Sequence, residues 1–175
     1  MVASAFQVDL ERVKVSATRT DKVPNTSPTA ASSGSDLNGM AALDACEKIL
    51  AGLTEFAAQN WSVSPETIRF SDNQVQIGEL EMPWETFVQT AYMNRVPLSS
   101  SGFYATPKIH YDPKSGTGRP FLYYSNCAAC AEVVVDTLTG EYRVLRTDIL
   151  FDAGRSLNPD IDIGQIEGGF VQGMG

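Results

Sequence analysis

Hydrophobic side chains recur at helical spacing in two stretches of the chain. Between residues 37 and 58 the apolar positions follow a period near 3.6 residues, which predicts an amphipathic helix. The polar loop at residues 20–35 runs directly into Asp36, which we predict to be the N-cap of that helix. A second amphipathic helix is predicted from about Trp84 to Met93.

Alternating apolar and polar positions predict the strands. A short strand is expected at residues 12–17, where Val13, Val15 and Ala17 share one face, and another at residues 74–77. The later half is strand-rich, with strands predicted at residues 102–111, 121–125, 129–136 and 142–151. Residues 137–141 supply the turn of a hairpin between the last two, and the glycine-punctuated residues 161–175 suit a helix. The predicted fold class is α+β.

Composition and charge narrow the classes of partner. The formal net charge is -8 and the 13 Lys and Arg residues are scattered, so no nucleic-acid partner is expected. No apolar run approaches the roughly 20 residues of a membrane-spanning helix, and residues 1–8 lack the features of a signal peptide. Three cysteines are an odd and sparse set that fits a reducing compartment. We therefore expect a cytoplasmic protein without a membrane partner.

The loop before the first helix is the most informative stretch for ligand binding. Residues 29–35 (TAASSGS) carry small side chains that let backbone amides approach a ligand closely. The positive end of the helix dipole favours an anionic group, so an oxyanion or a phosphate could bind there. The competing interpretation is ordinary capping and turn chemistry, which Ser and Gly also favour.

The cysteines and the histidine give weaker signals. Cys127 and Cys130 have the CxxC spacing of redox and zinc sites, but Cys46 and His110 provide no second ligand pair. In an extended segment, residues three apart point to opposite faces, which favours two buried structural cysteines. His110 has no accompanying nucleophile motif, and we expect it to be a packing or surface residue.

Several carboxylates and one glutamine remain candidates for chemistry. Each carboxylate is explained at least as well by a turn, cap or solvated role; they are Glu132, Asp148, Asp152, Asp162 and Glu167. The amide of Gln165 offers donors and acceptors that match the edge of a heterocyclic ring. Gly164, Gly168 and Gly169 would leave space for that ring, although a helix packing face made of small residues is the alternative.

Five blocks of sequence resemble, in the same order, the molybdenum-binding region of the xanthine dehydrogenase family. The blocks are residues 20–39 (TDKVPNTSPTAASSGSDLNG), 98–107 (LSSSGFYATP), 132–140 (EVVVDTLTG), 145–149 (LRTDI) and 156–175 (SLNPDIDIGQIEGGFVQGMG). The resemblance covers nearly the whole chain, and residues 57–82 match least. The KVPNT and ALDACEKI stretches look more like bacterial xanthine dehydrogenases than aldehyde oxidases.

The resemblance implies a molybdenum hydroxylase that oxidises hypoxanthine to xanthine and xanthine to urate. Its cofactor is molybdenum held by molybdopterin, with FAD and 2Fe-2S iron-sulfur clusters expected in the complete enzyme but not bound by this segment. The implied partners are a purine substrate and an FAD/iron-sulfur subunit or domain, within an oligomeric assembly.

Carried over residue by residue, the resemblance assigns two groups of cofactor contacts. Ala31 matches the alanine at the molybdenum, and Ala30 beside it lines the substrate space. Ser32, Ser33 and Gly34 continue the backbone contacts to the molybdopterin. Gln165 matches a glutamine that hydrogen-bonds the cofactor.

The family's other functional groups have no counterpart in this sequence. The catalytic glutamate belongs to a GEPP-type motif that is absent, and Glu167 is not that residue. The GGxEMGQG cofactor loop, the substrate-stacking phenylalanines and the substrate-binding arginine and glutamate are also missing. We therefore expect residues 1–175 to be an incomplete segment of the molybdenum-cofactor-binding domain, inactive alone and with exposed apolar surface.

The sequence leaves two alternative functions open. One is an aldehyde or other N-heterocycle hydroxylase of the same family, because the substrate-selecting residues lie outside this sequence. The other is a non-catalytic module that binds the cofactor or interacts with another protein.

Overall fold

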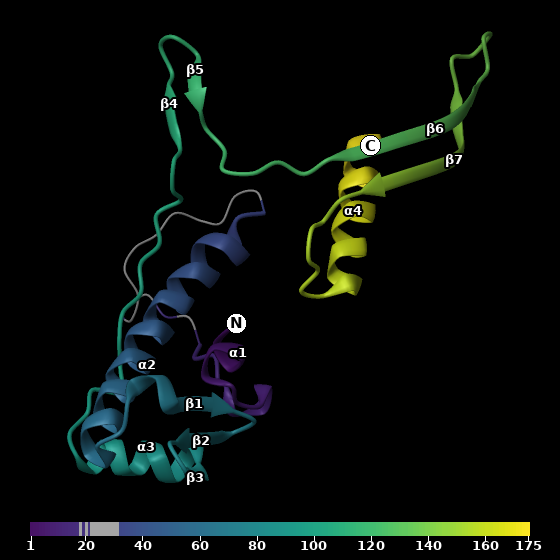
Figure 1. Ribbon diagram of the computed structural model, residues 1–175. Coiled ribbons are helices and arrows are strands. Elements are labelled where there is room, and N and C mark those ends of the chain that lie inside the picture. The colour runs from purple at the N-terminus through teal and green to yellow at the C-terminus, as the bar shows by residue number, and fades with distance from the viewer. Residues whose placement is uncertain (18, 20, 22–31) are drawn as a thin grey trace. The chain divides into compact units, whose positions relative to one another are not determined.

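The chain consists of two compact units, Met1–Thr106 and Pro107–Gly175. The computed structural model describes residues 1–17, 19, 21 and 32–175 (Figure 1). The secondary structure of the described residues consists of helices and small antiparallel sheets, so the predicted α+β class is confirmed. None of the helices in this part of the chain is long and apolar enough to cross a membrane.

The first unit combines two long helices with a small sheet. The sheet has three antiparallel strands in the order β1-β2-β3, so each strand pairs with the next along the chain. The elements are α1 (Val2–Phe6), the 3-10 helix η1 (Leu10–Arg12), the π-helix η2 (Gly34–Asn38), α2 (Gly39–Trp61), the 3-10 helix η3 (Pro65–Thr67), β1 (Ile68–Ser71), β2 (Gln74–Ile77), β3 (Leu80–Pro83) and α3 (Trp84–Met93).

A core centred on Phe87 joins the C-terminal half of α2 to the sheet and α3. The deepest side chains, each at most 2% exposed, are Leu53, Ala57, Val75, Ile77, Phe87 and Ala91. Four aromatic rings surround Phe87 at centroid distances of 6.1–6.2 Å, those of Phe56, Trp61, Phe70 and Trp84. The apolar faces of both helices and of β2 therefore meet at one ring, and tilted aromatic contacts of this kind add to the stabilisation from burial.

The start of the chain contradicts the strand predicted at residues 12–17. These residues pair with no strand in the described part of the chain, and Val15 is 94% exposed, so the alternation has no buried face to support it. Residues 6–12 instead contact the rest of the first unit through side chains and backbone groups. The Phe6 ring lies 5.7 Å from Trp84, Arg12 forms an ion pair with Glu85, and the backbone N–H of Asp9 donates to Asn73 Oδ1 at 2.9 Å.

The first long helix begins earlier than its pattern predicted. Helical turns start with η2 and continue without a break through α2, so Asp36 lies inside the first turn and is not the N-cap. The Ser33 backbone occupies the N-cap position, and Asp36 Oδ1 accepts the N–H of Leu37 at 2.9 Å. The predicted strand at residues 74–77 and helix at residues 84–93 are confirmed as β2 and α3.

The second unit contains two hairpins and a helix. Its elements are β4 (His110–Asp112), β5 (Thr117–Arg119), β6 (Cys127–Val135), β7 (Tyr142–Phe151) and α4 (Pro159–Met174). The predicted hairpin around residues 137–141 and the helix near residues 161–175 are confirmed. The Asn158 side chain caps α4 by accepting the N–H groups of Asp160 and Ile161 at 3.2 and 3.4 Å.

Two of the strands predicted in the later half are wrong. Of residues 102–111 only His110 and Tyr111 are paired, as the start of β4, and residues 121–125 join no sheet in the described chain. The FLYY stretch is apolar without alternation, and Phe121, Tyr123 and Tyr124 are exposed. A run of β-forming residues alone did not specify a pairing partner.

One face of the β6–β7 hairpin is almost wholly apolar. The register places five cross-strand pairs on this apolar face: Cys127 with Phe151, Ala129 with Ile149, Ala131 with Thr147, Val133 with Val144, and Val135 with Tyr142. The opposite face carries Glu132, Arg143, Arg146 and Asp148. None of residues 107–175 is buried, so the exposed apolar surface expected from the sequence is confirmed.

Replacing Phe87 by Ala tests the core of the first unit. We expect the free energy of unfolding to fall by about 3–5 kcal/mol, because the ring leaves a cavity among four aromatic neighbours. Urea unfolding followed by the fluorescence of Trp61 and Trp84, the only two tryptophans, measures the change. Tyr92→Ala on the same helix, where the side chain is 65% exposed, should change it by less than about 0.5 kcal/mol. Similar losses from both variants would contradict this core.

Two neighbouring valines of β6 test the apolar face. Val135 lies on the apolar face and Val134 on the opposite face, and their exposures are 52% and 50%. We expect Val135→Lys to reduce the binding of an apolar fluorescent dye to the isolated chain, because it interrupts a continuous patch. Val134→Lys should have a smaller effect. Equal reductions would show that the dye does not recognise this face.

Candidate cofactor-contact segments

Ser32, Ser33 and Gly34 lie where the chain enters the long helix of the first unit. Gly34 is the first residue of η2, Ser33 precedes it, and the N–H of Leu37 donates to the Ser33 carbonyl oxygen at 3.0 Å. The predicted location of these residues at a helix N-terminus is thus confirmed. Ala30 and Ala31, including the predicted molybdenum contact at Ala31, lie outside the described residues.

The entry to this helix offers hydrogen-bond donors beside small side chains. Ser32 is exposed, Ser33 and Gly34 are half-buried, and a Cβ placed on Gly34 would meet no atom within 4 Å. The first-turn N–H groups carry the positive end of the helix dipole, while the Asp36 carboxylate in the same turn offsets part of that charge. The segment therefore suits a polar ring edge at least as well as a fully charged anion.

Gln165 lies on a face of α4 that carries three glycines. At 100° per residue it shares an arc of roughly 140° with Gly164, Gly168 and Gly169, and a Cβ at any of these glycines would meet no atom within 4 Å. Its side chain makes no hydrogen bond to any residue that the structure describes. An amide with free donors and acceptors next to an open helix surface can bind the edge of a heterocycle.

These two segments belong to different units. Ser32–Gly34 is in Met1–Thr106 and Gln165 is in Pro107–Gly175, and each is defined by contacts within its own unit. Among the described residues there is no group of three His, Cys, Asp or Glu side chains that could hold a metal ion directly.

The three cysteines are free thiols. Cys127 and Cys130 pair with Phe151 and Asp148, which places them on opposite faces of the hairpin as expected. The expectation that both are buried is wrong, because both hairpin faces are exposed. Cys46 is only 4% exposed, and this burial raises the pKa of its thiol. His110 is an exposed residue of β4, which confirms a surface role.

The carboxylates have the local roles that their sequence contexts suggested. Asp148 forms an ion pair with Arg146 at 2.7 Å, and Asp152 Oδ1 accepts the N–H of Gly154 at 2.9 Å. Asp162 accepts the hydroxyl of Ser156. Glu132 and Glu167 are exposed. Nothing in these contacts singles out a general acid or base.

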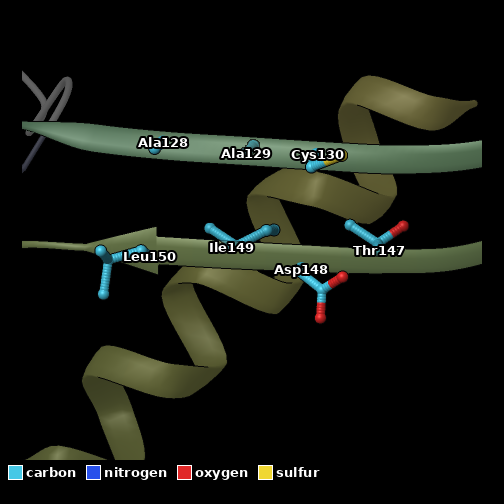
Figure 2. Close-up of a pocket in the computed structure, with 7 residues that line it drawn as sticks. All are labelled: Ala128, Ala129, Cys130, Thr147, Asp148, Ile149 and Leu150. Atoms are coloured by element: carbon cyan, nitrogen blue, oxygen red, sulfur yellow. The ribbon is translucent and has the colours of Figure 1, made fainter.

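A hollow of about 510 Å³ lies beside the β6–β7 hairpin (Figure 2). It is lined by Ala128, Ala129, Cys130, Thr147, Asp148, Ile149 and Leu150. The Thr147 hydroxyl is shielded from solvent and has no hydrogen-bond partner in the described part of the chain. None of the predicted cofactor-binding residues lines this hollow, and Asp148 is already paired with Arg146. We assign no chemistry to it.

Comparison with known proteins identifies what this chain is similar to. A family model described as a molybdopterin cofactor-binding domain matches residues 1–175. The chain is 47% identical over 178 residues to a xanthine dehydrogenase of Dictyostelium discoideum and 45% identical over 175 residues to a xanthine dehydrogenase/oxidase of Felis catus. Each alignment covers 100% of this chain and 12% of the relative. The chain thus spans about 12% of the length of these curated relatives.

The fold is also similar to that of a solved structure, the reconstituted CO dehydrogenase from Oligotropha carboxidovorans. The TM-score is 0.71 at 21% sequence identity, and the match covers 96% of this chain and 20% of that chain. At this identity the similarity concerns the fold only.

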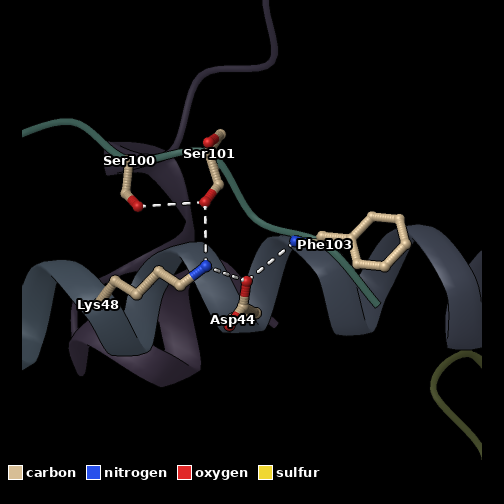
Figure 3. A network of polar contacts seen from close by, with 5 residues as sticks. All are labelled: Asp44, Lys48, Ser100, Ser101 and Phe103. Carbon is tan, nitrogen blue, oxygen red and sulfur yellow. Dashed lines mark hydrogen bonds and ion pairs between the residues drawn. The ribbon is translucent and has the colours of Figure 1, made fainter. Parts of the chain in front are cut away.

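A polar contact that sequence reasoning missed holds residues 98–106, which we call the strap, against α2 (Figure 3). Asp44 Oδ2 accepts the Lys48 ammonium at 2.7 Å and the backbone N–H of Phe103 at 2.9 Å, and Lys48 Nζ donates to the Ser101 carbonyl oxygen at 3.4 Å. The Lys48 hydrogen bond, and then that of Phe103, hold the pKa of Asp44 below its ordinary value of 3.8. The four-residue spacing of Asp44 and Lys48 is visible in the sequence, but the strap is more than fifty residues away.

Acid titration tests this contact. Because the folded-state pKa of Asp44 is lowered, its contribution to stability is present above the ordinary carboxyl pKa and is lost as pH falls through the lowered value. We expect Asp44→Asn to lower the thermal midpoint at pH 7 and the difference from the unmodified chain to shrink below about pH 4. Thermal unfolding of both chains from pH 7 to pH 2.5 measures this. A difference that stays constant over that range would contradict the ionised contact.

Proposed function

The chain belongs to the family of molybdopterin cofactor-binding domains, and on that basis we propose that residues 1–175 supply part of the cofactor site of a molybdenum hydroxylase. The reaction we propose is oxidation of hypoxanthine to xanthine and of xanthine to urate. The observation that carries the substrate is the 47% identity, over the whole chain, to a xanthine dehydrogenase.

The residues of both segments fit such a cofactor. Molybdopterin presents ring nitrogen, carbonyl and phosphate groups, which need both donors and acceptors. We propose that the backbone of Ser32, Ser33 and Gly34, with the hydroxyls of the two serines, holds one part of the molybdopterin. The Gln165 amide holds another part of it. Open space around Gly34 and around the glycines beside Gln165 supports this assignment. Ala30 and Ala31 would continue the first segment, with Ala31 next to the molybdenum.

The contribution of this chain is to bind and orient the cofactor. When bound, the molybdenum centre supplies the oxidation of the substrate. Gln165 would fix the orientation of the cofactor through a directional amide hydrogen bond, and the small residues at the helix entry would let the backbone approach it closely. The carboxylates described above are occupied by turns, caps and an ion pair or are exposed, so we place the general base and the substrate-selecting groups elsewhere in the enzyme.

We further propose that residues 1–175 form an incomplete segment of a larger cofactor-binding domain. The exposed apolar face of β6–β7 and the 12% share of its relatives' length support this. FAD and iron-sulfur clusters would then bind to another domain or subunit of an oligomeric enzyme. The three free thiols support a cytoplasmic location.

Gln165→Ala in the complete protein tests the assignment. We expect turnover of xanthine to fall about ten-fold or more, because a hydrogen bond to the cofactor is lost. Glu167→Gln on the opposite side of α4 is the matched control and should leave turnover unchanged. Xanthine-dependent NAD reduction and molybdenum content are the measurements.

Two outcomes would contradict the proposal in different ways. A complete protein that contains molybdenum and oxidises aldehydes but no purine would show that the substrate is wrong. A complete protein purified without molybdopterin would show that the cofactor role is wrong. The isolated 175-residue chain should show no xanthine-dependent NAD reduction.

A further inference from the structure

Only half of the long helix α2 is held by the core of the first unit. Its contributions to the core cluster come from residues 49–61, namely Ile49, Leu53, Phe56, Ala57, Ala58 and Trp61. The helical turns before them contribute nothing to that cluster, and in Figure 1 this half of α2 extends past β1–β3 and α3. The projecting half, residues 34–45, begins with the segment that we propose contacts the cofactor. Because a short helix is marginally stable in water, this half needs support from the side.

Two close contacts supply support from different sides of the projecting half. A Cβ on Gly39 would overlap Met1 Sδ and lie 2.8 Å from Met1 Cε, so the Met1 side chain lies directly against the helix backbone. A Cβ on Gly102 would overlap the Ala41 carbonyl oxygen and lie 2.8 Å from Ala45 N. At 100° per residue the two contacts are roughly 140° apart around the helix. The Gly102 contact requires glycine, because a Cβ there would meet the backbone of α2. At Gly39 a Cβ would meet the end of the flexible Met1 side chain, which could move aside.

The strap connects the projecting half to the core. Leu98, at its start, packs against the core cluster, and Gly102 and Phe103 lie beside Ala41, Asp44 and Ala45. The strap therefore runs antiparallel to α2, from the anchored end toward the cofactor-contact segment. Asp44 secures it by accepting the Phe103 N–H, while Lys48 secures the Ser101 carbonyl oxygen (Figure 3).

We propose that Asp44 and Gly102 are positioning residues that brace the projecting half of α2 and thereby hold Ser32–Gly34 in place for the cofactor. This inference rests on the cofactor role proposed above. Neither residue touches the cofactor in this arrangement; each acts through the helix. A cofactor held by directional backbone hydrogen bonds tolerates little displacement of its donors, so loosening the brace lowers cofactor retention before it unfolds the core.

The test uses the complete protein with three variants and a matched control. Asp44→Ala removes the acceptor for both Lys48 and Phe103, Asp44→Asn keeps an acceptor for Phe103 but removes the ion pair, and Gly102→Ala forces the strap away from the helix. The control is Glu55→Gln, which changes a carboxylate on the anchored half of α2 whose contact is the Gln59 side chain at 3.2 Å.

The measurements are amide hydrogen exchange and the rate at which molybdenum is lost on dialysis. We expect Asp44→Ala and Gly102→Ala to speed exchange in residues 34–45 by about ten-fold while residues 49–57 exchange as before. Molybdenum loss should accelerate in the same two variants, less in Asp44→Asn, and not in Glu55→Gln. Asp44→Asn keeps the comparison informative if a more severe variant does not fold.

Each other result would count against the inference. Unchanged exchange in residues 34–45 would show that the strap does not brace the helix. Faster exchange in that half together with unchanged molybdenum retention would show that the brace does not position the cofactor contacts. If amide exchange became faster to the same extent in both halves of α2, Asp44 and Gly102 would only stabilise the fold as a whole and would not brace the projecting half. An unmodified protein without molybdenum would instead overturn the proposed function, while the exchange data would still report on the brace.

Discussion

Burial of Phe87 fixes one end of α2 and leaves the other end to be held by different forces. The ring lies among four aromatic neighbours and collects the apolar faces of α2, α3 and β2, so the C-terminal half of α2 has a dense hydrophobic anchor. The N-terminal half contributes nothing to that cluster; among the described residues Met1 and the strap lie against it, and α1 also packs on α2. The proposed cofactor contacts therefore lie at the end of a helix whose rigidity depends on a glycine contact and a charge-assisted hydrogen bond.

The second unit, unlike the first, has no hydrophobic core of its own. It has two hairpins and a helix but no buried residue, and the apolar face of β6–β7 stays exposed. A hairpin with such a face is marginal in water without a covering layer. Its sequence nevertheless places apolar residues on one face and charges on the other, which is the pattern of a sheet that is covered on one side. This agrees with a chain that spans a small share of its relatives' length.

Sequence reasoning succeeded where the pattern was long or strongly periodic. The helix at residues 84–93, the body of α2, the β6–β7 hairpin and α4 were predicted, because each carries many positions of one period or a clear turn. Length alone did not decide the outcome, because the four-residue β2 was also predicted, whereas the strand expected at residues 102–111 is paired only at its last two residues. Val13 and Val15 alternate but find no partner strand, and β1 and β3, with four residues each, give almost no periodic signal.

Some residues of the candidate site could be proposed from the sequence, whereas others are apparent only in the structure. Ser32–Gly34 and Gln165 could be proposed from the sequence, because the local chemistry and the family resemblance pointed to the same residues. Asp44 and Gly102 could not be found from the sequence, because their importance comes from a contact between segments more than fifty residues apart. Burial of Cys127 and Cys130 was predicted incorrectly for a related reason, since burial depends on whatever covers the hairpin rather than on the hairpin itself.

A structure of the complete protein with its cofactor bound would test the central claim most directly. We expect the molybdopterin to lie with the backbone of Ser32–Gly34 and the side-chain amide of Gln165 at hydrogen-bond distance, about 3 Å. A cofactor bound elsewhere in the protein, with both segments covered by other parts of the chain, would contradict it.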